Sequence, residues 1–178
     1  MRKIFIGLIF ILLNFNLTLG NQYVINLIPN FIGFFLIAKG CGHLFEQTRI
    51  QEYQETQKLS FILTGISFLS FIGDLIGIGS INQLFATLIG IFNLVLLLYL
   101  LYRLTKSIIN TQEFNLPEYL TTQLNNAFKW IVIANILAYL MIFFPLLAII
   151  ILLVALVAHI LYIITIHKIS KEIQPHYL

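Results

Sequence analysis

Residues 146–167 read LLAIIILLVALVAHILYIITIH, a run of 22 residues without Lys, Arg, Asp or Glu. A helix of about 20 predominantly apolar residues is long enough to cross the hydrocarbon core of a bilayer. A charged side chain at the centre of such a helix costs about 2.5–3.5 kcal/mol, so membrane-spanning segments rarely contain one. The run therefore predicts a membrane-spanning helix over 146–167.

Three long blocks of the chain are almost free of charge. Residues 4–38 and 130–167 contain no Lys, Arg, Asp or Glu, and residues 59–102 contain only Asp74. At 1.5 Å per residue, each block is too long for one crossing and about right for two. Each block therefore predicts a hairpin of two helices.

Helix-breaking residues stand near the middle of each block. They include Gly20, Gly77 and Pro145. These residues favour a turn, because glycine accepts turn conformations and proline cannot continue a helix. The predicted fold class is an all-α integral membrane bundle in a single domain, 1–178. Its six crossings lie at about 4–19, 30–45, 59–77, 82–102, 128–143 and 146–167.

The composition agrees with a chain that is solvated mainly by lipid. Of 178 residues, 60% are hydrophobic and 10% are charged, whereas soluble domains carry about 25% charged residues. This excludes a soluble enzyme, and Cys41, the single cysteine, excludes a disulfide scaffold. The net charge of +3 does not indicate a nucleic-acid partner, since the basic residues follow the predicted topology.

All ten Lys and Arg residues fall on one side of the membrane in this topology. The positive-inside rule assigns that side to the cytoplasm. Both termini and the segments 46–58 and 103–127 are therefore predicted to be cytoplasmic. Asp74 is the one charged residue that lies within a crossing.

The N-terminal segment has a second interpretation. Arg2 and Lys3 followed by the apolar run 4–13 are also typical of a secretory signal peptide. The residues at 14–20 form a poor cleavage site, because bulky and polar side chains precede Gly20. A retained first helix and a cleaved signal peptide both remain open.

Local signals predict where two helices begin. Asn30 is expected to cap a helix that starts at Phe31 and continues past Lys39 into 46–58. Pro117 and Glu118 are a favourable first turn for the helix that leads into the fifth crossing. Residues 21–29 are expected to fold back at the outer surface.

Apolar residues follow the Pro117 start at helical spacing; they are Leu120, Leu124, Ala127 and Ile131. This spacing predicts a helix on the inner membrane surface that Lys129 and Trp130 anchor at the headgroups. A docking face for a partner is the alternative.

Asp74 is the first candidate for a functional residue, because an ionisable group within a crossing is costly unless it has a role. The topology groups it at the outer side with Asn14, Asn16 and Asn30, which together predict a ligand-binding site. A structural cap or a helix-pairing role for Asp74 is the alternative.

Three polar residues lie deeper in predicted crossings. Asn93 and Asn135 are expected to hydrogen-bond between helices. His159 is expected to bond a neighbouring helix, with proton relay as the alternative.

The sequence contains no recognisable catalytic or metal-binding motif. There is no Gly-x-Ser-x-Gly, no His-Glu-x-x-His and no P-loop. Cys41 and His43 lie close together, but no further His or Cys stands at a ligand-like spacing from them. We therefore expect no catalytic residues, no bound metal and no cofactor.

Residues 24–37 read VINLIPNFIGFFLI. This stretch resembles a Leu-Pro-Asp-Phe-Ile-Gly-Tyr-like segment of small, uncharacterised multi-pass proteins from low-GC Gram-positive bacteria. Asn30 and Phe34 stand where that pattern favours Asp and Tyr. The resemblance covers mainly the first 50 residues; it implies a bacterial plasma-membrane protein and no particular activity.

The leading hypothesis is a non-catalytic multi-pass protein of the bacterial plasma membrane that acts through contacts with membrane or cytoplasmic proteins, or with further copies of itself. A small-solute binding or transport subunit, similar to the membrane substrate-binding subunits of vitamin importers, is the alternative. A bacteriocin immunity protein is a third hypothesis, on size alone.

Overall fold

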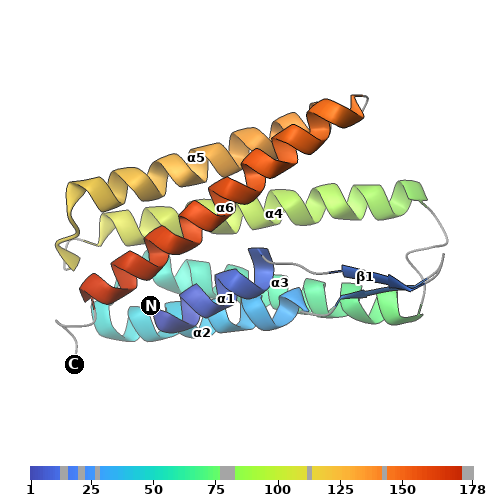
Figure 1. Cartoon of the computed structure of the whole chain (residues 1–178). Helices are drawn as coiled ribbons and strands as arrows, with labels where there is room; N and C mark the ends of the chain where they lie inside the picture. The colour runs from blue at the N-terminus through green and yellow to red at the C-terminus, as the bar shows by residue number, and fades with distance from the viewer. Residues whose placement is uncertain are drawn as a thin grey trace. The chain divides into compact units, whose positions relative to one another are not determined.

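The computed structural model describes residues 1–12, 16–19, 23–26, 29–76, 83–111, 114–141 and 144–173. The chain forms two compact units, Met1–Leu104 and Thr105–Leu178. The described residues form six helices and one antiparallel β-hairpin (Figure 1). The helical fold class is confirmed, and the single domain stays a prediction.

The elements follow one another along the chain with short connections. The first unit contains α1 (Arg2–Leu12), β1 (Asn16–Leu19), β2 (Tyr23–Asn26), α2 (Asn30–Thr48), α3 (Gln51–Ile76) and most of α4 (Gln83–Asn110). The second unit contains the last turns of α4, followed by α5 (Glu118–Leu140) and α6 (Pro145–Ile173).

The first helix is shorter than the sequence predicted. The helix expected over 4–19 ends at Leu12, and residues 16–19 instead pair with residues 23–26 in a hairpin that also contacts α3. Val, Ile, Tyr and Thr favour strands, and the apolar run gave no sign of this change. At 11 residues, α1 is about 16 Å long, about half of what a hydrocarbon core requires.

Helices α1 and α2 are antiparallel, and their backbones meet at glycines. A Cβ atom added at Gly33 would lie 2.6 Å from the carbonyl oxygen of Gly7, and one added at Gly7 would lie 2.6 Å from the carbonyl oxygen of Gly33. Nearer the other end, a Cβ atom at Gly40 would lie 2.5 Å from Ile4 Cγ1. Only a residue without a side chain allows this separation.

Aromatic rings join α2 to α3. The Phe31 ring lies 5.3 Å from that of Phe68 and 5.6 Å from that of Phe71, and the Phe35 ring lies 6.2 Å from that of Phe61. These centroid distances are typical of favourable edge-to-face pairs. The rings therefore hold together the halves of α2 and α3 in which Asp74 is the single charged residue.

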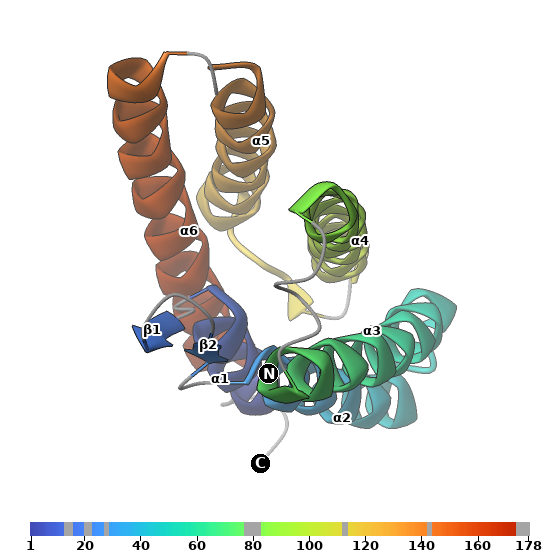
Figure 2. The same cartoon turned by 90° about the vertical axis from the view of Figure 1, so that its right-hand side faces the viewer.

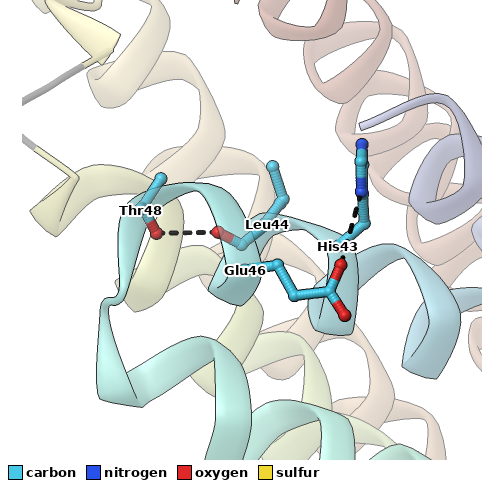
Figure 3. Close-up of polar contacts among 4 residues, drawn as sticks. All are labelled: His43, Leu44, Glu46 and Thr48. Atoms are coloured by element: carbon cyan, nitrogen blue, oxygen red, sulfur yellow. Dashed lines mark hydrogen bonds and ion pairs between the residues drawn. The ribbon is translucent and has the colours of Figure 1, made fainter.

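Helix α2 ends earlier than expected. The sequence predicted that it would continue into 46–58, but Arg49 adopts a left-handed conformation with φ of 57° and its N–H bonds Phe45 O. The Thr48 hydroxyl donates to Leu44 O at 2.9 Å and accepts a bond from the Ile50 N–H (Figure 3). The hydroxyl thus satisfies backbone groups at the break, and α3 restarts at Gln51.

The second unit confirms the start of the fifth helix. Helix α5 follows Pro117 and begins with Glu118. The four residues chosen by their spacing, Leu120, Leu124, Ala127 and Ile131, are all buried. Helix α6 starts at Pro145, as the break in the third block predicted.

Two helices contain segments that are long and apolar enough to cross a membrane. These segments are Leu88–Asn110 in α4 and Leu146–Ile173 in α6, where crossings were predicted at 82–102 and 146–167. Helices α2, α3 and α5 mix charged or polar residues with apolar ones along one half of their length. The other four crossings stay predictions.

Replacing Gly33 with alanine tests the contact between α1 and α2. Glycine to alanine within an open helix normally stabilises by about 0.5–1 kcal/mol. Gly33→Ala should instead destabilise, by about 1–3 kcal/mol, because the new methyl group meets the backbone of α1. Thermal unfolding of the purified protein in detergent measures the difference.

Gly65→Ala is the matched control, since a Cβ atom there meets nothing within 4 Å. Its unfolding temperature should equal or exceed that of the parent protein. The glycine contact would be disproved if Gly33→Ala were as stable as Gly65→Ala.

Candidate functional site

The outward polar residues are not assembled into a site by the described part of the chain. Asn14 lies outside the described residues, as does the side chain of Asp74, whose backbone is in the last turn of α3. Asn16 lies in β1, opposite Asn26. Ligand binding by this group therefore stays a prediction.

Asn30 does not cap α2 as predicted. The capping position is Pro29, and no side chain bonds the free N–H groups of the first turn. Asn30 is itself the first helical residue, half-buried, and its Oδ1 is buried without a hydrogen-bond partner among the described residues. Helix α2 begins one residue earlier than predicted, so Asn30 has helical backbone angles and its side chain cannot cap the first turn.

The deeper polar residues bond within their own helices. Asn135 donates from Nδ2 to Ile131 O at 2.8 Å, and His159 bonds the backbone carbonyl of Ala155. Bonds between helices were expected for both. The carbonyl four residues back is the nearest acceptor for a polar side chain in a helix. Asn93 lies half-buried on α4.

Charged residues collect at one end of each unit, which we call the charged end. Because the helices alternate in direction, this end in the first unit contains the start of α1, the α2–α3 connection and the last turns of α4. In the second unit it contains the start of α5 and the end of α6. Among the described residues, Asp74 alone lies at the opposite end.

An ion pair joins two helices at the charged end of the first unit. The Arg103 guanidinium on α4 contacts the Glu55 carboxylate on α3. The Arg103 side chain is 19% exposed and that of Glu55 is 50% exposed, so water screens only part of the attraction. The pair fixes the register of α4 against α3 where both helices carry polar residues.

A buried hydrogen bond has the same role in the second unit. The hydroxyl groups of Thr105 on α4 and Tyr162 on α6 are 2.9 Å apart, and both residues are almost fully buried. The two residues are 57 positions apart in sequence. The bond therefore specifies how the last turns of α4 pack against α6.

A groove of about 440 Å³ lies between α5 and α6, entirely within the second unit. Both views show α5 and α6 as neighbouring antiparallel helices that cross obliquely (Figures 1 and 2). The residues that line the groove are Gln123, Asn126, Ala127, Trp130, Val154, Val157, Ala158, Leu161, Ile164, Thr165 and Lys168.

The groove changes from apolar to polar along its length. Val154, Val157 and Ala158 line it toward the uncharged end, whereas Thr165 and Lys168 line it toward the charged end. Gln123 and Asn126 on α5 add side-chain amides. Lys168 is the single formal charge among these lining residues, and no described carboxylate pairs with it.

The sequence alone did not reveal this groove. The sequence predicted only that Trp130, one of the lining residues, anchors α5 at the headgroups. The groove depends on how α5 packs against α6, a tertiary property that spacing along either helix does not encode.

The charged end of the first unit also includes an exposed contact between His43 and Glu46. The His43 Nδ1 and Glu46 Oε2 atoms are 3.9 Å apart, and both side chains are mostly exposed (Figure 3). Among the described residues there is no group of three or more His, Cys, Asp or Glu that could hold a metal ion.

Comparisons with known proteins found no match: no family model, no curated protein and no solved structure resembles the chain at a significant level.

Removal of one hydroxyl tests the polar contact of the second unit. Tyr162→Phe leaves the Thr105 hydroxyl buried without its partner, which should destabilise the protein by about 1–3 kcal/mol. Tyr119→Phe is the matched control, because Tyr119 is exposed and should lose almost nothing. Equal unfolding temperatures for the two variants in detergent would contradict the role given to the bond.

Proposed function

We propose that the chain is a multi-pass protein of the bacterial plasma membrane that carries out no catalysis and acts through contacts made at its charged end. The observation that supports it most is the outward face of α4 and α6. In an apolar 18-residue stretch of each helix, only 22% of the residues are buried. A soluble protein would have to leave both faces in water, at about 25 cal/mol for each Å² of apolar area.

The exposed side chains of α6 include large aliphatic groups along most of the helix, such as Leu146, Ile149, Leu153 and Ile160. On α4 they include Leu88, Phe92 and Val95. Soluble monomers rarely expose a continuous row of large apolar side chains along a whole helix. Lipid chains are the solvent that covers such a surface without cost.

We propose six crossings with both termini in the cytoplasm. Helices α2 to α6 supply five of them. The first crossing begins with α1. The edges of a two-stranded hairpin expose unpaired backbone groups, so β1 and β2 belong at the outer headgroup level or against α3, away from hydrocarbon.

Small-solute binding is the second candidate, and Asn30 is the observation that favours it. A buried Oδ1 without a partner among the described residues carries a desolvation cost that a hydrogen-bonding ligand would remove. Asn30→Leu should then abolish any thermal shift that a vitamin or metabolite panel produces, and Asn93→Leu should not. Absence of a shift across the panel would remove the basis for this candidate.

Cysteine labelling tests the six-crossing topology directly. In a Cys41→Ala background, a cysteine at Ser80 should react with an impermeant maleimide added to intact cells. A cysteine at Lys106 should react only after the membrane is permeabilised. Labelling of Ser80 solely from the cytoplasmic side would contradict the topology.

Site-specific photocrosslinking tests where contacts with other proteins are made. A crosslinking residue at Glu46, whose side chain is 77% exposed at the charged end, should yield a defined protein adduct in native membranes. The same residue at Leu153, on the outward face of α6, should yield lipid adducts alone. Recovery of the uncrosslinked monomer from both positions would contradict action through protein contacts.

A further inference from the structure

We infer that the groove between α5 and α6 binds one anionic phospholipid, with the phosphate at Lys168 and an acyl chain along the apolar end. This inference rests on the proposed membrane location. It adds a ligand class and a binding site to the proposed function.

The chemistry of the lining matches an amphiphile with one negative charge. The phosphate end requires a cation and hydrogen-bond donors, which Lys168, Gln123 and Asn126 supply. The hydrocarbon end requires an uncharged aliphatic wall, which Val154, Val157 and Leu161 supply. A soluble anion would use only the first set, and a purely apolar ligand would use only the second.

The dimensions fit a single leaflet. From Val154 to Lys168, 14 residues of α6 rise about 21 Å, and one leaflet with its headgroup region is about 20–22 Å thick. The volume of about 440 Å³ lies within the range of about 300–1,000 Å³ that is common for ligand sites.

The charge also selects the leaflet and the lipid. The polar end of the groove lies at the charged end of the second unit, which the positive-inside rule places in the cytoplasmic leaflet. The cytoplasmic leaflet carries anionic headgroups, and one Lys near its surface contributes about 1 kcal/mol toward them. No described carboxylate neutralises Lys168 by an ion pair.

Trp130 provides a specific reporter because it lines the groove and is the single tryptophan of the chain. The full-length protein is reconstituted in phosphatidylcholine vesicles that contain a small fraction of phosphatidylglycerol. Either lipid is brominated on its acyl chains, so that quenching of Trp130 measures the relative binding constant of the two lipids at the groove.

Phosphatidylglycerol should be favoured about fivefold over phosphatidylcholine, the ratio that corresponds to about 1 kcal/mol. Lys168→Gln should reduce the ratio to about one, and Lys168→Arg should restore it, since guanidinium also binds phosphate. Lys171→Gln is the matched control: it removes the same charge from the same end of α6 without lining the groove, and should leave the ratio unchanged.

Three results would overturn the inference. A ratio near one in the parent protein would show no selectivity. An equal reduction by Lys168→Gln and Lys171→Gln would assign the selectivity to diffuse charge. Absence of quenching by either lipid, in protein that sediments with the vesicles, would show that another protein segment fills the groove. Failure of the protein to associate with vesicles would instead contradict the proposed function.

Discussion

In the proposed membrane location, the cost of placing a charge in hydrocarbon is the constraint on which the rest of this structure depends. An antiparallel arrangement of helices brings alternate ends together, so charged residues far apart in sequence gather at one end of each unit. Glu55 and Arg103 illustrate this, because they are 48 positions apart in sequence and still form an ion pair. The remaining length of α4 and α6 is left to apolar side chains.

Packing in the two units follows different physical rules. In the first unit, α1 and α2 approach through glycines and α2 and α3 through aromatic rings. Close backbone contact and ring packing are effective in lipid, where the hydrophobic effect does not drive helices together. In the second unit, the buried Thr105–Tyr162 bond orders the polar end, and a groove remains between α5 and α6.

Local chemistry predicted some elements well. Pro117 and the spacing of Leu120 and Leu124 predicted α5 and its buried face, and Pro145 predicted the start of α6. The end of α1 at Leu12 could not be predicted, since the strands that follow are stabilised by pairing across the hairpin. The break at Arg49 likewise depends on a left-handed backbone conformation that the Arg residue itself does not favour.

The sequence predicted less of the candidate site than of the fold. Asp74 was chosen because it is the single charged residue in the otherwise apolar block 59–102, which can be read from the sequence. Lys168 gave no such signal, because a lysine at the end of a membrane helix is ordinary. Its interest comes from the amides on α5 that face the same groove, a relation that only the packing of α5 against α6 creates.

The central claim is that lipid covers the outward face of α6. A nitroxide placed in turn at Leu153, Leu156 and Ile160 of the protein in vesicles measures this through collision with oxygen and with a water-soluble nickel complex. The account predicts high oxygen accessibility and almost no nickel accessibility at all three positions, which are exposed in the structure. Nickel accessibility that equals that of an exposed loop residue would contradict it.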